Sequence, residues 1–178
     1  IFVWSGTVMA GKFEKANTFT GSSVSSLTLG SIFSADYNFY NVYIRGGMTG
    51  VSDIAAERPK LKVLTAAGAE FSTGIYDFTS FELNGSSITD NNANADQDNS
   101  ILNILATGGN TFSAHLKVFN PLSTTFYKYI WAACIGSGGY NKVGTMVKSQ
   151  VAAGGLKIEI AGNTFDEIHA AVYGIKHT

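Results

Sequence analysis

Regular alternation of apolar and polar residues in the last third of the chain constrains the fold more than any other feature. Within Thr111–Asn120, the side chains on one face of an extended chain are Phe112, Ala114, Leu116 and Val118. Serine, histidine and lysine fall on the other face, and such period-two alternation is typical of a strand with one buried side. The same reasoning predicts further strands, separated by glycine-rich turns, at Phe126–Ile135, Leu156–Ile160 and Ile168–Ile175.

Two earlier segments also have the composition of strands. Tyr37–Arg45 carries aromatic and β-branched residues on both faces, as expected of a central strand that is covered on two sides. Lys60–Thr65 alternates lysine with apolar residues. Only Thr49–Arg58 favours a helical turn, which Pro59 would end because proline restricts the residue before it.

Short strand patterns, frequent glycine turns and no long helical period predict an all-β fold. We expect an antiparallel β-sandwich that is jelly-roll-like, and a length of 178 residues is suitable for such a fold. The sandwich domain is predicted to span residues 37–178. Residues 1–36 are rich in serine and threonine and are expected to form an N-terminal extended arm or short strands.

The charge of the chain argues against two classes of partner. Its net charge is −1 and its 12 basic residues are scattered, so we expect no nucleic-acid binding, which needs clustered cations. No apolar run approaches the ~18 residues of a membrane span, so no membrane insertion is expected. Charged residues make up 14% of the chain, so we expect its surface to be covered by serine, threonine, asparagine and glycine, or else by another protein chain.

The segment Thr89–Ser100 contains no large apolar side chain and is predicted to be a solvated loop. Asp90, Asn92 and Asn94 stand at alternate positions, as the first ligands of a calcium loop do. Alanine and isoleucine then occupy the sixth and twelfth positions, where such a loop needs glycine and glutamate. We therefore predict no metal site, and assign Asp90, Asp96 and Asp98 to a ligand or receptor surface instead.

Catalytic residues are not predicted anywhere in the chain. Cys134 lies in an apolar segment and is expected to be a buried thiol rather than a nucleophile. His115, His169 and His177 lack the spacing of metal ligands, and no Gly-x-Ser-x-Gly elbow is present. The chain is thus expected to be no enzyme and to bind no cofactor.

Aromatic residues are abundant and raise the hypothesis of sugar binding, because flat rings stack on pyranose faces. Most of them lie in predicted strands, where packing in the core is the commoner fate. Tyr140, which Gly139 and Asn141 flank, and Tyr76 are the better candidates for an exposed platform. Asn141, beside Tyr140, completes the predicted ligand or receptor surface.

Two short motifs resemble β-sandwich domains of tailed-bacteriophage virion proteins. One is the strand that ends in Asn120-Pro121 and a Ser/Thr-rich turn, and the other is Gly162-Asn163-Thr164-Phe165 followed by a closing strand with Tyr173-Gly174-Ile175. On residues alone, Asn120-Pro121 is equally a strand-ending turn and Tyr173 a core aromatic.

The resemblance implies a non-enzymatic virion protein that decorates the capsid or forms part of a tail or head fibre. Its partners would be other virion proteins and copies of itself in a homotrimer, and its location the virion. The alternative is a lectin-like carbohydrate-binding module for host-surface glycans.

Overall fold

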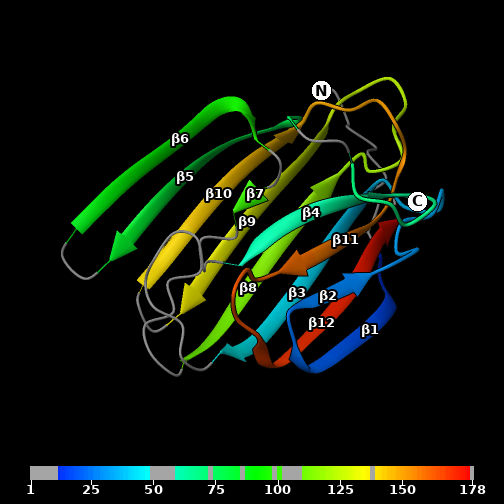
Figure 1. Cartoon of the computed structure of the whole chain (residues 1–178). Helices are drawn as coiled ribbons and strands as arrows, with labels where there is room; N and C mark the ends of the chain where they lie inside the picture. The colour runs from blue at the N-terminus through cyan, green and yellow to red at the C-terminus, as the bar shows by residue number, and fades with distance from the viewer. Residues whose placement is uncertain are drawn as a thin grey trace, which may run out of the picture.

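The computed structural model describes residues 12–48, 59–71, 74–84, 87–97, 100–101, 110–136 and 139–176, and these form strands and connections without any helix. Twelve strands are present (Figure 1). In chain order they are β1 (Lys12–Val24), β2 (Ser26–Leu29), β3 (Phe39–Met48), β4 (Lys60–Thr65), β5 (Tyr76–Asn84), β6 (Ser87–Gln97), β7 (Ser100–Ile101), β8 (Asn110–Phe119), β9 (Lys128–Gly136), β10 (Gly139–Val147), β11 (Ala153–Glu159) and β12 (Phe165–Lys176).

The strands form two sheets, and every pairing between them is antiparallel. The larger sheet has eight strands in the order β1-β12-β3-β8-β9-β10-β5-β6, and the smaller has four in the order β2-β11-β4-β7. Each of β2, β4, β7 and β11 follows and precedes a strand of the larger sheet, so the chain passes repeatedly from one sheet to the other. The predicted all-β antiparallel sandwich of jelly-roll type is confirmed.

The core lies between the two sheets. The smaller sheet contributes Leu29, Leu156 and Ile158, and the larger contributes Val42, Leu116 and Val172, all without exposed surface. In β8 the four apolar residues of the alternating pattern are all buried, as predicted. Burying an aliphatic side chain of this size contributes roughly 1.5–3 kcal/mol, so the contact between the sheets is the main source of stability.

The N-terminal residues that the structure describes belong to both sheets. Strand β1 pairs with β12 from Lys12 to Val24, at one edge of the larger sheet. Strand β2 pairs with β11, and its Leu27 and Leu29 are buried in the core. The predicted helical turn at Thr49–Arg58 lies outside the described residues.

The prediction of a loop at Thr89–Ser100 is wrong. Most of this segment is part of β6, which pairs with β5 along its length and forms the other edge of the larger sheet. Backbone hydrogen bonds to one neighbour hold an edge strand in the sheet, so it does not need apolar side chains. Polar side chains at an edge also discourage pairing with other chains. The backbone of β6 is extended rather than curled as in a calcium loop.

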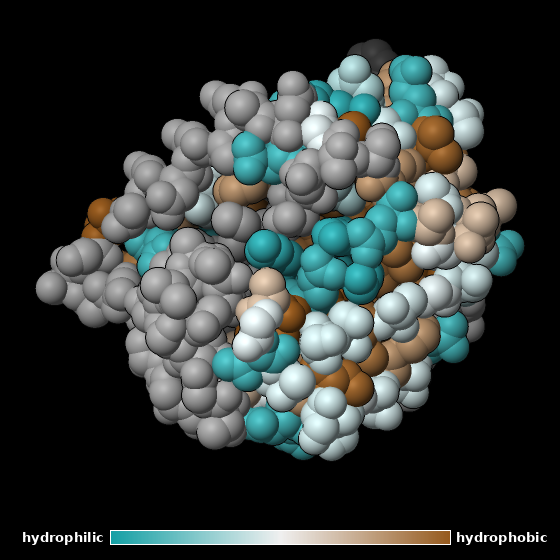
Figure 2. Space-filling view, viewed as in Figure 1, coloured by the Kyte–Doolittle hydropathy of each residue, from teal (hydrophilic) through white to brown (hydrophobic). Residues whose placement is uncertain are grey.

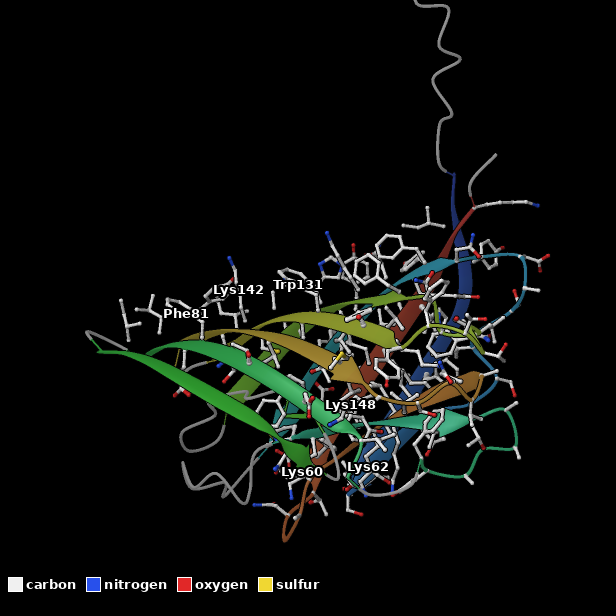
Figure 3. All side chains as sticks on the ribbon, turned by 90° about the horizontal axis from the view of Figure 1, so that it is seen from above. Lys60, Lys62, Phe81, Trp131, Lys142 and Lys148 are labelled. Carbon is white, nitrogen blue, oxygen red and sulfur yellow. The ribbon has the colours of Figure 1, made fainter. Side chains whose placement is uncertain are left out.

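The two sheets cover each other unequally. The four strands of the smaller sheet lie over one face of the larger sheet, which we call its inner face. The other, outer face carries Phe81, Trp131 and Lys142, whereas Lys60 and Lys62 lie on the far side of the sandwich (Figure 3). The prediction that the strand at Tyr37–Arg45 is covered on two sides is therefore wrong, since Tyr43 on the outer face is 44% exposed.

Tyr76 links the two sheets and is not an exposed platform, contrary to the sequence prediction. It is 1% exposed, at the start of β5, and its hydroxyl accepts a hydrogen bond of 2.8 Å from the backbone N–H of Val63 in β4. Burial raises the pKa of Tyr76 to about 12. The polar end of a buried tyrosine needs such a partner, and here the partner belongs to the opposite sheet.

Replacing Tyr76 by phenylalanine tests this structural role. Tyr76→Phe leaves the N–H of Val63 unpaired in the core, and we expect a loss of about 1–3 kcal/mol in the free energy of unfolding. Urea denaturation measures it. The control, Tyr43→Phe, makes the same chemical change at an exposed ring and is expected to stay within about 0.5 kcal/mol of the parent. Equal losses in the two variants would contradict the assignment.

Candidate functional site

The outer face of the larger sheet carries aligned rows of side chains that cross the strands. Strand register brings together Ala171, Tyr43, His115, Ala133 and Lys142, one residue each from β12, β3, β8, β9 and β10. The neighbouring row contains, in the same strand order, His169, Arg45, Ser113, Ile135 and Tyr140. Because alternate residues of a strand point to the same face, both rows face outward.

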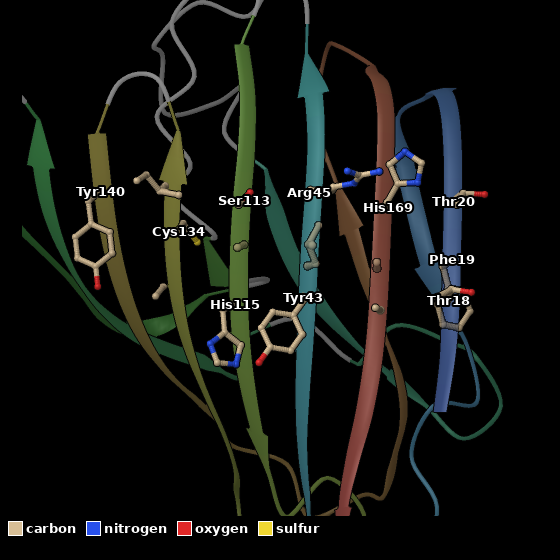
Figure 4. Close-up of a pocket in the computed structure, with 16 residues that line it drawn as sticks. Thr18, Phe19, Thr20, Tyr43, Arg45, Ser113, His115, Cys134, Tyr140 and His169 are labelled. Carbon is tan, nitrogen blue, oxygen red and sulfur yellow. The ribbon is translucent and has the colours of Figure 1, made fainter. Parts of the chain in front are cut away.

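All residues of these two rows except Lys142 line a groove of about 590 Å³, which we call the outer groove (Figure 4). It runs across β1, β12, β3, β8, β9 and β10. Adjacent strands lie about 4.8 Å apart, so a groove across six strands is roughly 24 Å long. Small side chains at Ser113, Ala133 and Ala171 line it between larger neighbours. The groove is thus long and shallow, and most of its lining is apolar.

Aromatic rings stand beside this groove. The rings of Tyr43 and His115 are stacked, with centroids 4.5 Å apart and planes 8° apart, and the ring of Tyr173 meets Tyr43 edge-on. Tyr173 is therefore half-buried on the outer face rather than part of the core. Tyr140 lines the other end, with the ammonium of Lys142 5.7 Å from its ring centroid. Such cation–π contacts orient the ring and the charge together.

A buried amide orients the imidazole in the groove. Nε2 of His115 lies 2.8 Å from Oδ1 of Asn41, which is 4% exposed. Because an amide oxygen only accepts hydrogen bonds, this contact requires the proton on Nε2 and leaves Nδ1 as an acceptor. Burial, and secondly the charge of Lys117, lower the pKa of His115 from its ordinary value of 6.5. The side chain is neutral at pH 7 and can accept a hydrogen bond from a ligand hydroxyl.

The residues of the predicted ligand or receptor surface do not form one site in the structure. Tyr140 lines the outer groove, as an exposed platform requires. Asn141, the next residue, points to the inner face and is 1% exposed, and its amide has no hydrogen-bond partner among the described residues. Asp90 and Asp96 lie in β6 with only their backbone described, and Asp98 lies outside the described residues.

Other sequence predictions concern titratable groups. Cys134 is buried, as predicted, and burial raises the pKa of its thiol to about 12, which makes it a poor nucleophile. His169 lines the groove, 3.4 Å from the carboxylate of Glu167, and His177 lies outside the described residues. The parts of the chain described hold no cluster of His, Cys, Asp or Glu suited to a metal ion, and no helix long and apolar enough to cross a membrane.

Comparisons with known proteins do not assign a family. No protein-family model matches the sequence, and no curated protein does. Among solved structures, the chain is similar to a PL-14 alginate lyase from Aplysia kurodai, at 8% identity and a TM-score of 0.40, over 83% of this chain and 73% of the lyase. It is also weakly similar to lectin I-B4 from Griffonia simplicifolia, at 8% identity and a TM-score of 0.37, over 98% and 96% of the two chains. A third is an exo-inulinase from Aspergillus awamori, at 10% identity and a TM-score of 0.39, over 94% of this chain and 30% of that one.

The lowered pKa of His115 gives a prediction for its environment. We expect an imidazole pKa below 6.5 in the parent and a partial rise in Lys117→Gln, because the lysine is the smaller of the two causes. Two-dimensional NMR of the histidine side chains across pH measures both values. Lys60→Gln removes the same charge from the far side of the sandwich and should leave the pKa unchanged.

The same shift sets the sign of a pH effect on stability. The unfolded chain binds a proton at His115 near pH 6.5, whereas the folded chain binds it only at lower pH, so this group destabilises the fold as pH falls from 6.5 toward the folded pKa. His115→Gln should flatten that part of the stability profile. A pKa of 6.5 or above for His115 would refute the proposed environment.

Proposed function

We propose that this protein is a carbohydrate-binding β-sandwich module that holds an extended polysaccharide chain in the outer groove. One observation carries the proposal: exposed or half-exposed aromatic rings line an open groove that crosses six strands. The faces of pyranose rings are apolar, so they gain from contact with aromatic rings, while their hydroxyls need polar partners at the rim. Tyr43 and Tyr140 would supply the rings, and His115 a hydrogen-bond acceptor.

The shape of the groove favours a polymer over a single sugar. A monosaccharide site is usually a pocket enclosed on several sides, as small-ligand sites are concave and bury most of the ligand. The outer groove instead extends for roughly 24 Å and is formed by strand side chains rather than by loops. Side chains on paired strands are held at fixed spacing, which suits a ligand with a regular repeat.

Alanine substitutions of exposed tyrosines test the proposal. Tyr43→Ala and Tyr140→Ala should each weaken binding to the preferred polysaccharide by about tenfold, the loss expected for one stacking contact. Tyr127→Ala is the matched control, because Tyr127 is 40% exposed, close to the 44% of Tyr43, but does not line the groove. Affinity electrophoresis in gels that contain single polysaccharides gives the dissociation constants, and circular dichroism checks the fold.

Two results would contradict glycan binding in the groove. One is no binding across a broad panel of plant, algal and bacterial polysaccharides. The other is equal weakening by Tyr127→Ala and Tyr43→Ala, which would place the contact elsewhere on the surface.

A structural role in a bacteriophage virion is a second proposal. It is supported by the resemblance at Asn120-Pro121 and Tyr173-Gly174-Ile175, and by apolar side chains that are exposed at one end of the outer face. Ile135 and Ile88 are 59% and 66% exposed, and strand register connects them through Tyr140 and Leu83. A contiguous exposed apolar patch suits contact with another protein chain.

This second proposal is tested on particles and in solution. A virion protein should occur at a fixed number of copies in purified phage particles, and a trimer should appear in sedimentation equilibrium. Leu83→Ser, at the middle of the apolar row, should weaken that trimer, whereas Phe126→Ser, which is exposed elsewhere, should not. Absence from particles together with a monomer in solution would exclude the role.

A further inference from the structure

Three cations of the outer face, Arg45, Lys117 and Lys142, make no ion pair with a carboxylate among the described residues. Arg45 is exposed, lines the outer groove, and makes no ion pair in the described part of the chain. Lys142, on β10, is also exposed, and its ammonium makes no ion pair with a described residue but lies over the ring of Tyr140. Lys117, in the next row of the sheet, lies 5.3 Å from the ring centroid of Trp131. Aromatic rings hold these lysines in place without neutralising them.

Two lysines of the smaller sheet, by contrast, are neutralised by carboxylates. On the solvent face of the smaller sheet, Glu70 accepts from Lys62 and Lys157 at 2.7 and 2.6 Å, and Glu159 lies 2.9 and 2.8 Å from the same two ammonium groups. This network forms the hydrophilic band over β4 and β11 (Figure 2). Hydrogen bonds from the two lysines lower the pKa of Glu70. These two lysines therefore differ from Arg45, Lys117 and Lys142 of the outer face, which have no carboxylate partner among the described residues.

Carboxylates are also missing from the groove itself. Among the described residues that line it, Arg45 is the one permanent cation, His115 is neutral at pH 7, and none is acidic. Arg45 and His169 stand side by side at one end (Figure 4), and the nearby Glu167 lies 3.4 Å from His169. A ligand in the groove would thus meet positive charge with little competition from the protein's own acids.

We infer, given the proposed glycan function, that the ligand of the outer groove is an acidic polysaccharide, bearing carboxylate or sulfate groups on its sugars. Arg45 would bind one acidic group in bidentate fashion, as guanidinium does with carboxylate and sulfate-like anions. Lys142 would bind another beside the Tyr140 ring. The aromatic rings hold the sugar faces, and the cations select for charge.

The spacing of the cations indicates repeated negative charge. Arg45 on β3 and Lys142 on β10 are separated by β8 and β9, which places them about 14 Å apart across the sheet. A single acidic sugar cannot reach both, whereas a polymer with an acidic group on each or every second unit can. A nucleic acid also repeats its charge, but the few cations of this face and the net charge of −1 offer much less than such a polyanion requires.

Matched ligands separate this inference from the proposed function. A panel of polyuronates and sulfated polysaccharides is tested by affinity electrophoresis, each beside its carboxyl-reduced or desulfated form. At least one acidic polymer should bind, and its neutral form should bind more than tenfold more weakly. Arg45→Gln and Lys142→Gln should each weaken binding of the acidic form by about tenfold and reduce its salt dependence. Lys60→Gln, on the far side of the sandwich, is the control for loss of charge.

The outcomes are distinguishable. If neutral forms bind as tightly as acidic ones and Tyr43→Ala weakens both, the glycan function stands and the acidic ligand is excluded. If no polysaccharide binds, both are excluded. A single-stranded oligodeoxynucleotide is included, and tighter binding to it than to every polysaccharide would overturn the inference in favour of nucleic acid.

Discussion

The unequal size of the two sheets is the constraint on which the rest of the structure depends. Four strands bury the inner face of an eight-stranded sheet, and the outer face of that sheet meets solvent. Its outward side chains do not have to fill a core, so they are available to contact a ligand. Aromatic residues are nevertheless retained there, at Tyr43, Tyr129 and Phe119, each at least 38% exposed. Large apolar side chains exposed together favour a binding surface over a merely solvated one.

The outer groove is a consequence of residue size along strands that are already in register. Small side chains at Ala171, Ser113 and Ala133 stand next to Tyr43 and His115, and the difference in height produces the groove. No loop is needed to shape it. A site of this kind is as rigid as the sheet, because each side chain is fixed by two neighbouring strands, and its specificity resides in which strand positions are large, small or charged.

Sequence periodicity predicted the parts of the fold in which one face of a strand is buried. The alternation in β8 was sufficient to predict the strand and its buried residues, because a strand that is buried on one side alternates apolar and polar residues. It failed at β6, an edge strand that needs no apolar residues, and at Tyr76, whose hydrogen bond reaches a strand of the opposite sheet. The strand that contains Tyr43 was predicted to be covered on both faces, because an outward aromatic has the same pattern whether protein or ligand covers it. Tyr140 was found because glycine and asparagine flank it.

The positive charge of the outer face could not have been predicted from the composition of the chain. A net charge of −1 indicates no preference for anions, yet it is the sum of a neutralised network around Glu70 and Glu159 and of cations such as Arg45 that have no acidic partner. Those two parts lie on opposite sides of the sandwich, and only the folded strand order separates them. Electrostatic attraction acts over about 10 Å at physiological salt, less than the extent of the groove, so a ligand responds to the local charge of the outer face rather than to the total. For a protein with few charged residues, their distribution over the two sheets is therefore more informative than their sum.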